Sequence, residues 1–195
     1  MDQVHSIEKI FLRDHLKLRH FVTNSKNELY EDKNGNIYIS EGTNRCVHVF
    51  SDEGRFLFRF GNTGDRPFGL PNDISLDGEG NIWVTDTLNH CIQVFSSEGC
   101  FLKTFTGMGD GTLQKPIGIC CLDDGRVAIA DQSGYLVKLF NTEGYFIKGL
   151  KSRGITENGL FTLTYDSHFG ILGPDSWTPQ IIQISSDLET VSTFK

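Results

Sequence analysis

The sequence predicts an all-β protein built as a β-propeller, and three observations carry this prediction. A segment recurs at a spacing of 45 residues along the chain. Within each copy, hydrophobic residues alternate with period two, as in strands, and not with the period of a helix. Turns that contain glycine divide each copy into four short strands. Four antiparallel strands in a repeat of about 40–50 residues are typical of a propeller blade.

The repeat is clearest between residues 31–60 and 76–105, where 14 of 30 positions are identical without a gap. Residues 121–150 keep the same spacing, so that Glu41, Asp86 and Asp131 correspond. Four blades are therefore expected over about residues 25–60, 70–105, 115–150 and 160–194, with a partial blade over residues 1–13. These blades form a single domain of about four and a half blades, an incomplete ring. A β-solenoid is the alternative, but its coils are usually shorter.

The second copy shows the elements in order. Residues 72–76, 82–85, 92–95 and 101–105 are predicted as its four strands. Asp77–Gly80 is expected to form the first tight turn, and Ser96–Gly99 the turn between strands three and four. Gly99 suits a positive φ there. Ile82, Trp83 and Val84 place apolar side chains on both faces of one strand, which is typical of a sheet packed between two others.

Four segments of this copy resemble the NHL repeat, namely Pro71–Asp77, Gly80–Asp86, Asn89–Phe95 and Gly99–Phe101. The resemblance covers roughly residues 27–150 well and 160–194 poorly. It implies an NHL-type β-propeller like that of tripartite-motif proteins, and the chain could be a fragment of such a ubiquitin-pathway protein. NHL propellers usually have more blades than this chain supplies. No RING, B-box or coiled coil is expected, so ligase activity does not carry over.

Composition narrows the function classes. The chain carries 18 Lys and Arg against 25 Asp and Glu, a net charge of −7, which makes it a poor general binder of polyanions. The first residues lack a basic start followed by an apolar stretch, and none of the five cysteines forms a CxxC pair. We therefore expect a cytoplasmic protein with free thiols and no membrane segment.

The expected site is the propeller face that carries both the loops between strands two and three and the connectors between blades, because strand direction alternates within a blade. We interpret this face as a non-catalytic platform for protein partners. Its candidate partner-binding residues are cationic, aromatic or sulfur-containing side chains of types that are common at interfaces: Arg45, Arg59, Arg66, Phe68, His90, Met108, Lys115 and Tyr135. Self-association that completes the ring is a further expectation.

Two alternatives remain open. Single-stranded RNA could bind the same face, as it does in some tripartite-motif NHL domains, although Glu41, Asp65, Asp86 and Asp110 lie nearby. A calcium-dependent lactonase or lyase-type enzyme could use the central channel near Asn72, since oxygen ligands suit Ca²⁺. No convincing set of carboxylates accompanies that asparagine.

No cofactor and no metal is expected. In the similar peptide-amidating lyases, histidines after the connector proline hold zinc, but Asn72 and Ile117 occupy those positions here. Cys46 lies near His48, and Cys91 follows His90, which suggests a metal site at first. The two cysteines recur at one position of successive copies, however, and a free cysteine usually behaves as a small core residue.

Overall fold

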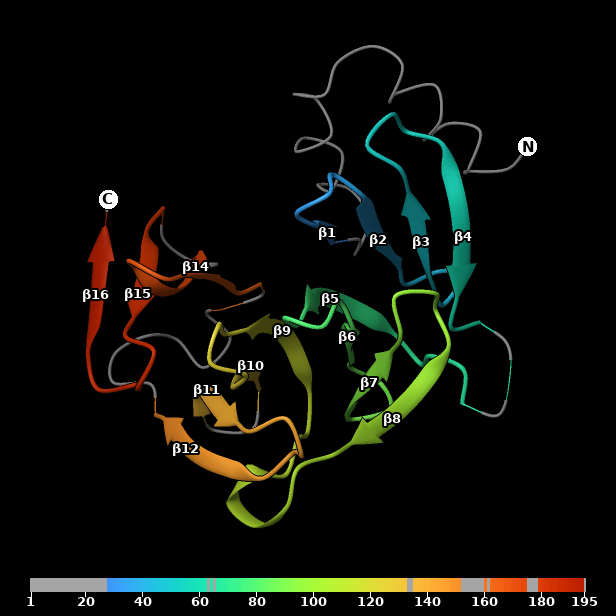
Figure 1. Ribbon diagram of the computed structural model, residues 1–195. Coiled ribbons are helices and arrows are strands. Elements are labelled where there is room, and N and C mark those ends of the chain that lie inside the picture. Colours follow the sequence, from blue (N-terminus) through green and yellow to red (C-terminus); the bar gives the residue numbers. More distant parts are fainter. Residues whose placement is uncertain are drawn as a thin grey trace.

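The computed structural model describes residues 28–62, 64, 66–132, 135–151, 160, 162–174 and 179–194, apart from the side chains of Tyr135 and Leu136. The predicted partial blade over residues 1–13 lies outside them. Four antiparallel sheets of four strands each follow one another along an arc (Figure 1). This arrangement confirms the prediction of an all-β propeller with an open ring. No helix among the described residues is long and apolar enough to cross a membrane.

Each sheet is a blade whose strands pair in sequence order. Blade 1 contains β1 (Leu29–Glu31), β2 (Ile37–Glu41), β3 (Cys46–Phe50) and β4 (Phe56–Phe60). Blade 2 contains β5 (Pro71–Leu76), β6 (Ile82–Asp86), β7 (Cys91–Phe95) and β8 (Phe101–Phe105). Blade 3 contains β9 (Pro116–Cys121), β10 (Val127–Asp131), β11 (Tyr135–Phe140) and β12 (Phe146–Leu150). Blade 4 contains β13 (Thr164–Asp166), β14 (Gly170–Pro174), β15 (Ile181–Ile184) and β16 (Val191–Phe194).

The turns follow from side chains that hold their own backbone. The Asp77 carboxylate accepts hydrogen bonds from the backbone N–H groups of Glu79 and Asn81, at 3.0 and 2.9 Å. Gly80 closes this turn with φ of 84°, a conformation that favours glycine. Gly99 has φ of 79°, as its place in the Ser96–Gly99 turn predicts. These hairpins fix the register of the strands on either side.

The core lies between the blades, because each middle strand has apolar residues on both faces. Ile82 and Val84 of β6 pack in a cluster shared with blade 1. Trp83, between them in sequence, packs in a cluster shared with blade 3. A third cluster, which includes Ala128 and Ile171, joins blades 3 and 4. Every pair of neighbouring blades is therefore held by its own dry interface.

Polar bonds also tie blade 2 to the innermost strand of blade 3. The Thr85 hydroxyl donates to the carbonyl oxygen of Ile117 at 2.8 Å. The Asp73 carboxylate accepts from the N–H of Ile119 at 2.8 Å, and the Ser75 hydroxyl accepts from the N–H of Cys121 at 3.0 Å. Side chains of blade 2 thus provide partners for backbone groups that face away from the ladder of blade 3. We call these three bonds the inner seam.

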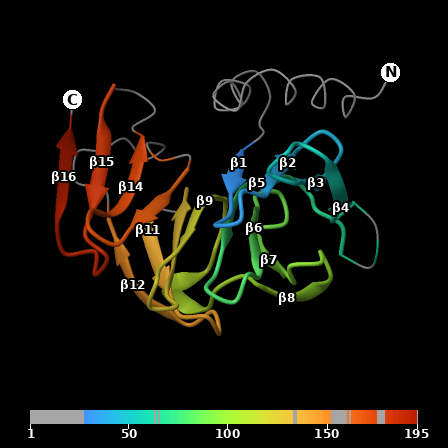
Figure 2. The ribbon, with the colours of Figure 1, turned by 45° about the horizontal axis from the view of Figure 1, so that its top comes forward.

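Blades 1 and 4 stand at the two ends of the arc (Figures 1 and 2). In blade 4, Ile181 and Phe194 pair across β15 and β16 and are 52% and 50% exposed. Within the described residues, no fifth sheet covers this side of blade 4.

Candidate functional site

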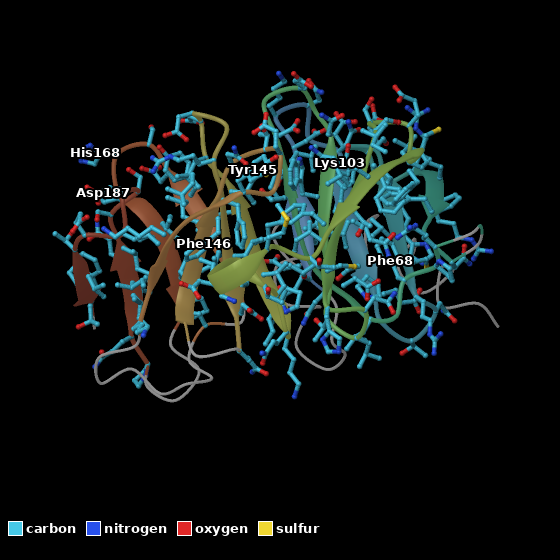
Figure 3. The ribbon with its side chains drawn as sticks, turned by 90° about the horizontal axis from the view of Figure 1, so that it is seen from below. Phe68, Lys103, Tyr145, Phe146, His168 and Asp187 are labelled. Carbon is cyan, nitrogen blue, oxygen red and sulfur yellow. The ribbon has the colours of Figure 1, made fainter. Side chains whose placement is uncertain are left out.

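The candidate site is the connector face, which we define as the β2–β3, β6–β7 and β10–β11 loops together with the β4–β5 and β8–β9 connectors. In Figure 3 this face lies below the sheets, on the side where Phe68 is labelled. The hairpin that carries Tyr145 lies on the opposite side. The short 3₁₀ helix η2 (Gly109–Gly111) belongs to the β8–β9 connector, so the glycine-rich stretch around it joins two strands.

Two buried carboxylates organise the connector face. Asp86, at the end of β6, accepts hydrogen bonds from the backbone N–H groups of Gly69 and Leu70, at 3.0 and 2.9 Å. Asp131, at the equivalent end of β10, accepts from the N–H groups of Gln114 and Lys115, at 3.1 and 2.7 Å. Each aspartate therefore holds the connector that enters its own blade. Their charge is directed inward, to backbone donors, and not to solvent.

A polar side chain on the next strand supports each of these aspartates. Gln93 donates to Asp86 at 2.9 Å, and Lys138 donates to Asp131 at 2.8 Å. Asn89 also donates to Asp86, at 2.7 Å. The Asp131 and Lys138 side chains are 0% and 2% exposed, so this ion pair is buried. A buried ion pair of this kind needs such complete hydrogen bonding, because desolvation costs much of its attraction.

The loops on this face have a fixed backbone conformation. Arg45 and His90 occupy equivalent loop positions, with positive φ of 54° and 55°. The His90 ring contacts the carbonyl oxygen of Gln114 through Nδ1, which links the β6–β7 loop to the β8–β9 connector. His90 itself is exposed. A loop that is already ordered loses less entropy when a partner binds.

A groove with a volume of about 570 Å³ lies between blades 2 and 3 on the connector face. It is lined by His90, Leu113, Gln114, Lys115 and Gln132. The structure therefore brings together two of the predicted residues, His90 and Lys115, although they are far apart in sequence. The lining combines a cation, two amides, an imidazole and one buried leucine, which suits a polar or anionic group.

The other predicted residues are distributed as follows. Arg45, Arg66 and Met108 are exposed on this face, with Met108 62% exposed. Arg59 is exposed too, but it lies within β4, opposite His48, and not in the connector. Tyr135 begins β11, and its side chain is outside the described residues.

Phe68 is a correction to the predicted set of contact residues. Its side chain is 0% exposed and lies 5.3 Å from Phe95 and 6.4 Å from Phe60, measured between ring centroids. The ring turns inward because Gly61, with φ of 92°, leaves space where a side chain would collide with it. Phe68 therefore anchors the connector to the core and cannot contact a partner.

Sequence reasoning missed Leu88, which is 60% exposed in the β6–β7 loop. An exposed leucine beside His90 adds an apolar contact to the face. It also missed Gln114 and Gln132 in the groove. Residue type alone gave no signal for the glutamines. Their place beside the recurrent Asp131 could have marked them, because the acid holds the connector that carries Gln114.

Of the described residues, Asn72 and Asp73 are the two that the enzyme alternative would place near the central channel, and both are bonded to other protein groups. The Asn72 amide donates to the Thr87 hydroxyl at 3.4 Å. Asp73 is buried, and besides Ile119 its carboxylate accepts from the Thr162 hydroxyl at 3.1 Å. Burial raises the pKa of Asp73 to about 8, and the charge of Glu28 adds to the increase. The Asp73 side chain thus links blade 2 to Ile119 in blade 3 and to Thr162, which precedes blade 4.

The family model described as NHL repeat matches residues 68–95. No curated protein matches the sequence significantly. Solved propellers match over most of the chain.

Virginiamycin B lyase from Staphylococcus aureus matches with a TM-score of 0.67 and 15% identity over 86% of this chain and 54% of its own. The WD40 repeats of RRP9 match with a TM-score of 0.64 and 14% identity over 85% and 49%. A chain of the nidogen/laminin complex matches with a TM-score of 0.63 and 16% identity over 86% and 63%.

At these identities the likeness shows the fold alone. The chain spans about half the length of the lyase and of the RRP9 propeller. The matched structures include both enzymes and binding proteins, so the fold does not separate the two classes. The match of the repeat model in blade 2 and the succession of four equivalent blades together support the assignment of this chain to the NHL-repeat β-propellers.

Proposed function

We propose that this chain is a non-catalytic binding platform, and that its connector face binds an acidic segment of a protein partner. One observation carries the proposal. The carboxylates of Asp86 and Asp131 are buried and bonded to backbone N–H groups, whereas Arg45, Arg66 and Lys115 are exposed. Asp110 is exposed on this face too, so its described residues offer a partner three exposed cations and one exposed acid, a more positive balance than the net charge of −7 suggests. Complementary charge guides the encounter and the choice of partner.

Apolar contacts would add affinity. Leu88 and Met108 are 60% and 62% exposed on the same face. Partner segments that combine acidic and apolar residues would satisfy both features. The matched chain of the nidogen/laminin complex belongs to a protein–protein complex, which supports protein binding as a possible use of such a scaffold.

Single-stranded RNA is the less favoured ligand. Proteins that bind single strands stack bases on aromatic side chains in addition to neutralising phosphates. Among the described residues of the connector face, no phenylalanine, tyrosine or tryptophan ring is exposed, because Phe68 is in the core, and His90 is the exposed ring that could stack a base. The enzyme alternative lacks support of its own beyond the fold, since the matched lyase is 15% identical.

Fluorescence anisotropy can test the proposal with three labelled probes: a peptide of alternating Glu and Leu, its Lys and Leu counterpart, and a single-stranded oligouridylate. We expect the acidic peptide to bind most tightly. Lys115→Glu should weaken its binding about tenfold or more, since a lost charge contact costs on the order of 1–2 kcal/mol.

The matched control is Lys33→Glu. Lys33 is exposed in the β1–β2 hairpin on the opposite face, and its substitution changes the net charge by the same amount. Equal losses for the two variants would attribute the binding to net charge and would contradict a site on the connector face. Tighter binding of the oligouridylate, with a steep decrease as salt rises, would favour the RNA alternative.

Self-association is a second proposal, supported by the exposed pair Ile181 and Phe194 on blade 4. Light scattering coupled to size exclusion tests it. A discrete dimer that becomes a monomer on Ile181→Asp would support it, and a compact monomer at all concentrations would contradict it.

A further inference from the structure

Blade 1 departs from its neighbours at the position of the buried carboxylate. In blades 2 and 3 an aspartate ends the second strand and is bonded by Gln93 or Lys138 from the third strand. In blade 1 the acid is Glu41, one methylene longer, and the residue seven positions later is His48. Their side chains meet at 2.7 Å, measured between Glu41 Oε2 and His48 Nε2.

A third side chain completes this group. Cys46 Sγ lies 3.2 Å from His48 Nε2 and 3.8 Å from Glu41 Oε2. The three residues are buried, with 0% exposure for Cys46, 1% for His48 and 6% for Glu41. All three potential ligand atoms lie within 4.8 Å of one another. We call this group the blade 1 cluster.

The side-chain atoms of the blade 1 cluster bond mainly to one another; in addition, Glu41 Oε1 accepts a hydrogen bond from the Asn44 amide at 2.6 Å. When Nε2 of His48 carries a proton, this single N–H can form a well-aligned hydrogen bond with the carboxylate or with the sulfur, but not with both. The thiol then has only the carboxylate oxygen 3.8 Å away as an acceptor. Nδ1 of His48 is buried and has no hydrogen-bond partner, and the ring packs between Phe50 and Phe56, with centroid distances of 6.4 and 6.2 Å. Buried polar nitrogen atoms normally have a hydrogen-bond partner, so the lack of one at Nδ1 is unusual.

We propose that the blade 1 cluster is a binding site for a divalent transition metal ion, with Zn²⁺ as the best fit. Zinc prefers sulfur, imidazole nitrogen and carboxylate oxygen in a tetrahedral arrangement, with bonds of about 2.0–2.3 Å. Such bonds place neighbouring ligand atoms about 3.3–3.6 Å apart. The Cys46–His48 and Cys46–Glu41 distances of 3.2 and 3.8 Å are close to this range, and only the Glu41–His48 contact must open to admit the ion.

Charge also favours the ion. A thiolate and a carboxylate together carry two negative charges, which a divalent ion balances, so the loaded site is neutral and can remain buried. The thiol proton is released to solvent on binding, as thiolate ligation requires. His48 ligates through Nε2 and keeps its proton on Nδ1. Three protein ligands leave the fourth tetrahedral position for a solvent oxygen. Glu41 ends β2, so the cluster lies next to the exposed β2–β3 loop.

Blade 2 provides a natural comparison. Cys91 occupies the position of Cys46, but Gln93 replaces His48, and an amide is a poor zinc ligand. Asp86 is also already bonded to the backbone of its connector. Blade 2 therefore has the cysteine without the site. Cys91 serves as a control residue, and Gln93 shows that the fold accepts glutamine at the position of His48.

Titration of the purified full chain with Co²⁺, followed by competition with Zn²⁺, tests the proposal. Cobalt bound to a thiolate gives an ultraviolet charge-transfer absorption and visible bands of tetrahedral geometry. The experiment uses a Cys100→Ser background, because Cys100 is exposed and could bind cobalt on its own. We expect one equivalent of cobalt to produce these bands and one equivalent of Zn²⁺ to remove them.

Three variants locate the ion. Cys46→Ser should abolish the charge-transfer band, and His48→Gln, which copies the residue of blade 2, should weaken binding more than tenfold, since even outer partners of metal ligands cost 10–100-fold. Cys91→Ser should leave both band and affinity unchanged. Circular dichroism shows whether each variant is folded. Absence of a thiolate band in the parent chain would overturn the proposal, and this result does not depend on how any variant folds. An equal loss of the band in the Cys46 and Cys91 variants would overturn it as well.

Discussion

The buried pair of Lys138 and Asp131 allows a quantitative test of how a blade holds its connector. Lys138→Met removes the ammonium but keeps most of the volume, and it leaves Asp131 buried without its cation. Breaking a buried pair in this way costs about 3–5 kcal/mol. Asp131 keeps the N–H donors of Gln114 and Lys115, so we expect the lower end, about 3 kcal/mol.

Lys138→Gln is the matched variant, because blade 2 has glutamine at this position. Gln93 reaches Asp86 at 2.9 Å, which shows that an amide can donate to the acid from the third strand. A neutral donor in place of an ammonium is expected to cost about 1–2 kcal/mol, the difference between charged and neutral hydrogen bonds.

Urea unfolding, read from tryptophan fluorescence and from circular dichroism, measures both costs from the shift in midpoint at constant slope. Coincident transitions from the two probes would justify a two-state treatment. If Lys138→Met lost less than about 1 kcal/mol, or if Lys138→Gln lost as much as Lys138→Met, the ion pair would not be the support that its geometry indicates.

Three further predictions concern single positions. The pKa of Asp73 is raised to about 8 in the folded state, so the folded state loses stability as pH rises from about 4, near the unfolded pKa, to about 8. The Asp73→Asn variant should therefore become more stable relative to the parent over that interval. Urea midpoints of the two proteins that stay parallel across pH would contradict this. Gly61→Ala places a Cβ 1.9 Å from an aromatic carbon and should destabilise the chain far more than Gly80→Ala, which adds positive-φ strain of about 1 kcal/mol in open space; thermal unfolding compares the two. Trp83→Phe loses the 2.9 Å bond from Nε1 to Asp77 and should cost about 1–3 kcal/mol in urea unfolding, so a neutral result would show that the indole N–H has no role.

Local features of the fold could be predicted because they depend on residues close in sequence. The strand Ile82–Asp86 and the turn at Gly99 follow from alternation and from glycine within a few positions. The 45-residue repeat then extended these elements to the other blades.

The candidate site could be predicted only in part, because its details depend on contacts between distant residues. Asp86 was expected to weaken an electropositive face, but its carboxylate is bonded to backbone groups 16 and 17 residues earlier. Phe68 was expected at the surface, and its inward orientation depends on the space at Gly61. The blade 1 cluster needed the strand register that places Glu41 directly opposite Cys46. The proximity of Cys46 and His48 was visible in the sequence, but the addition of Glu41 to them depends on the pairing of the two strands.

The inner seam has a consequence for how the molecule opens. Thr85, Asp73 and Ser75 join blades 2 and 3 by bonds that cannot survive if either blade unfolds alone. In blade 1 the residue equivalent to Thr85 is Ser40, whose hydroxyl accepts from the N–H of Glu28, beside β1 of the same blade. Blades 2 and 3 should therefore behave as one cooperative unit in native-state hydrogen exchange, with the amides of Ile119 and Cys121 exchanging only through its opening, while blade 1 opens at a lower free energy.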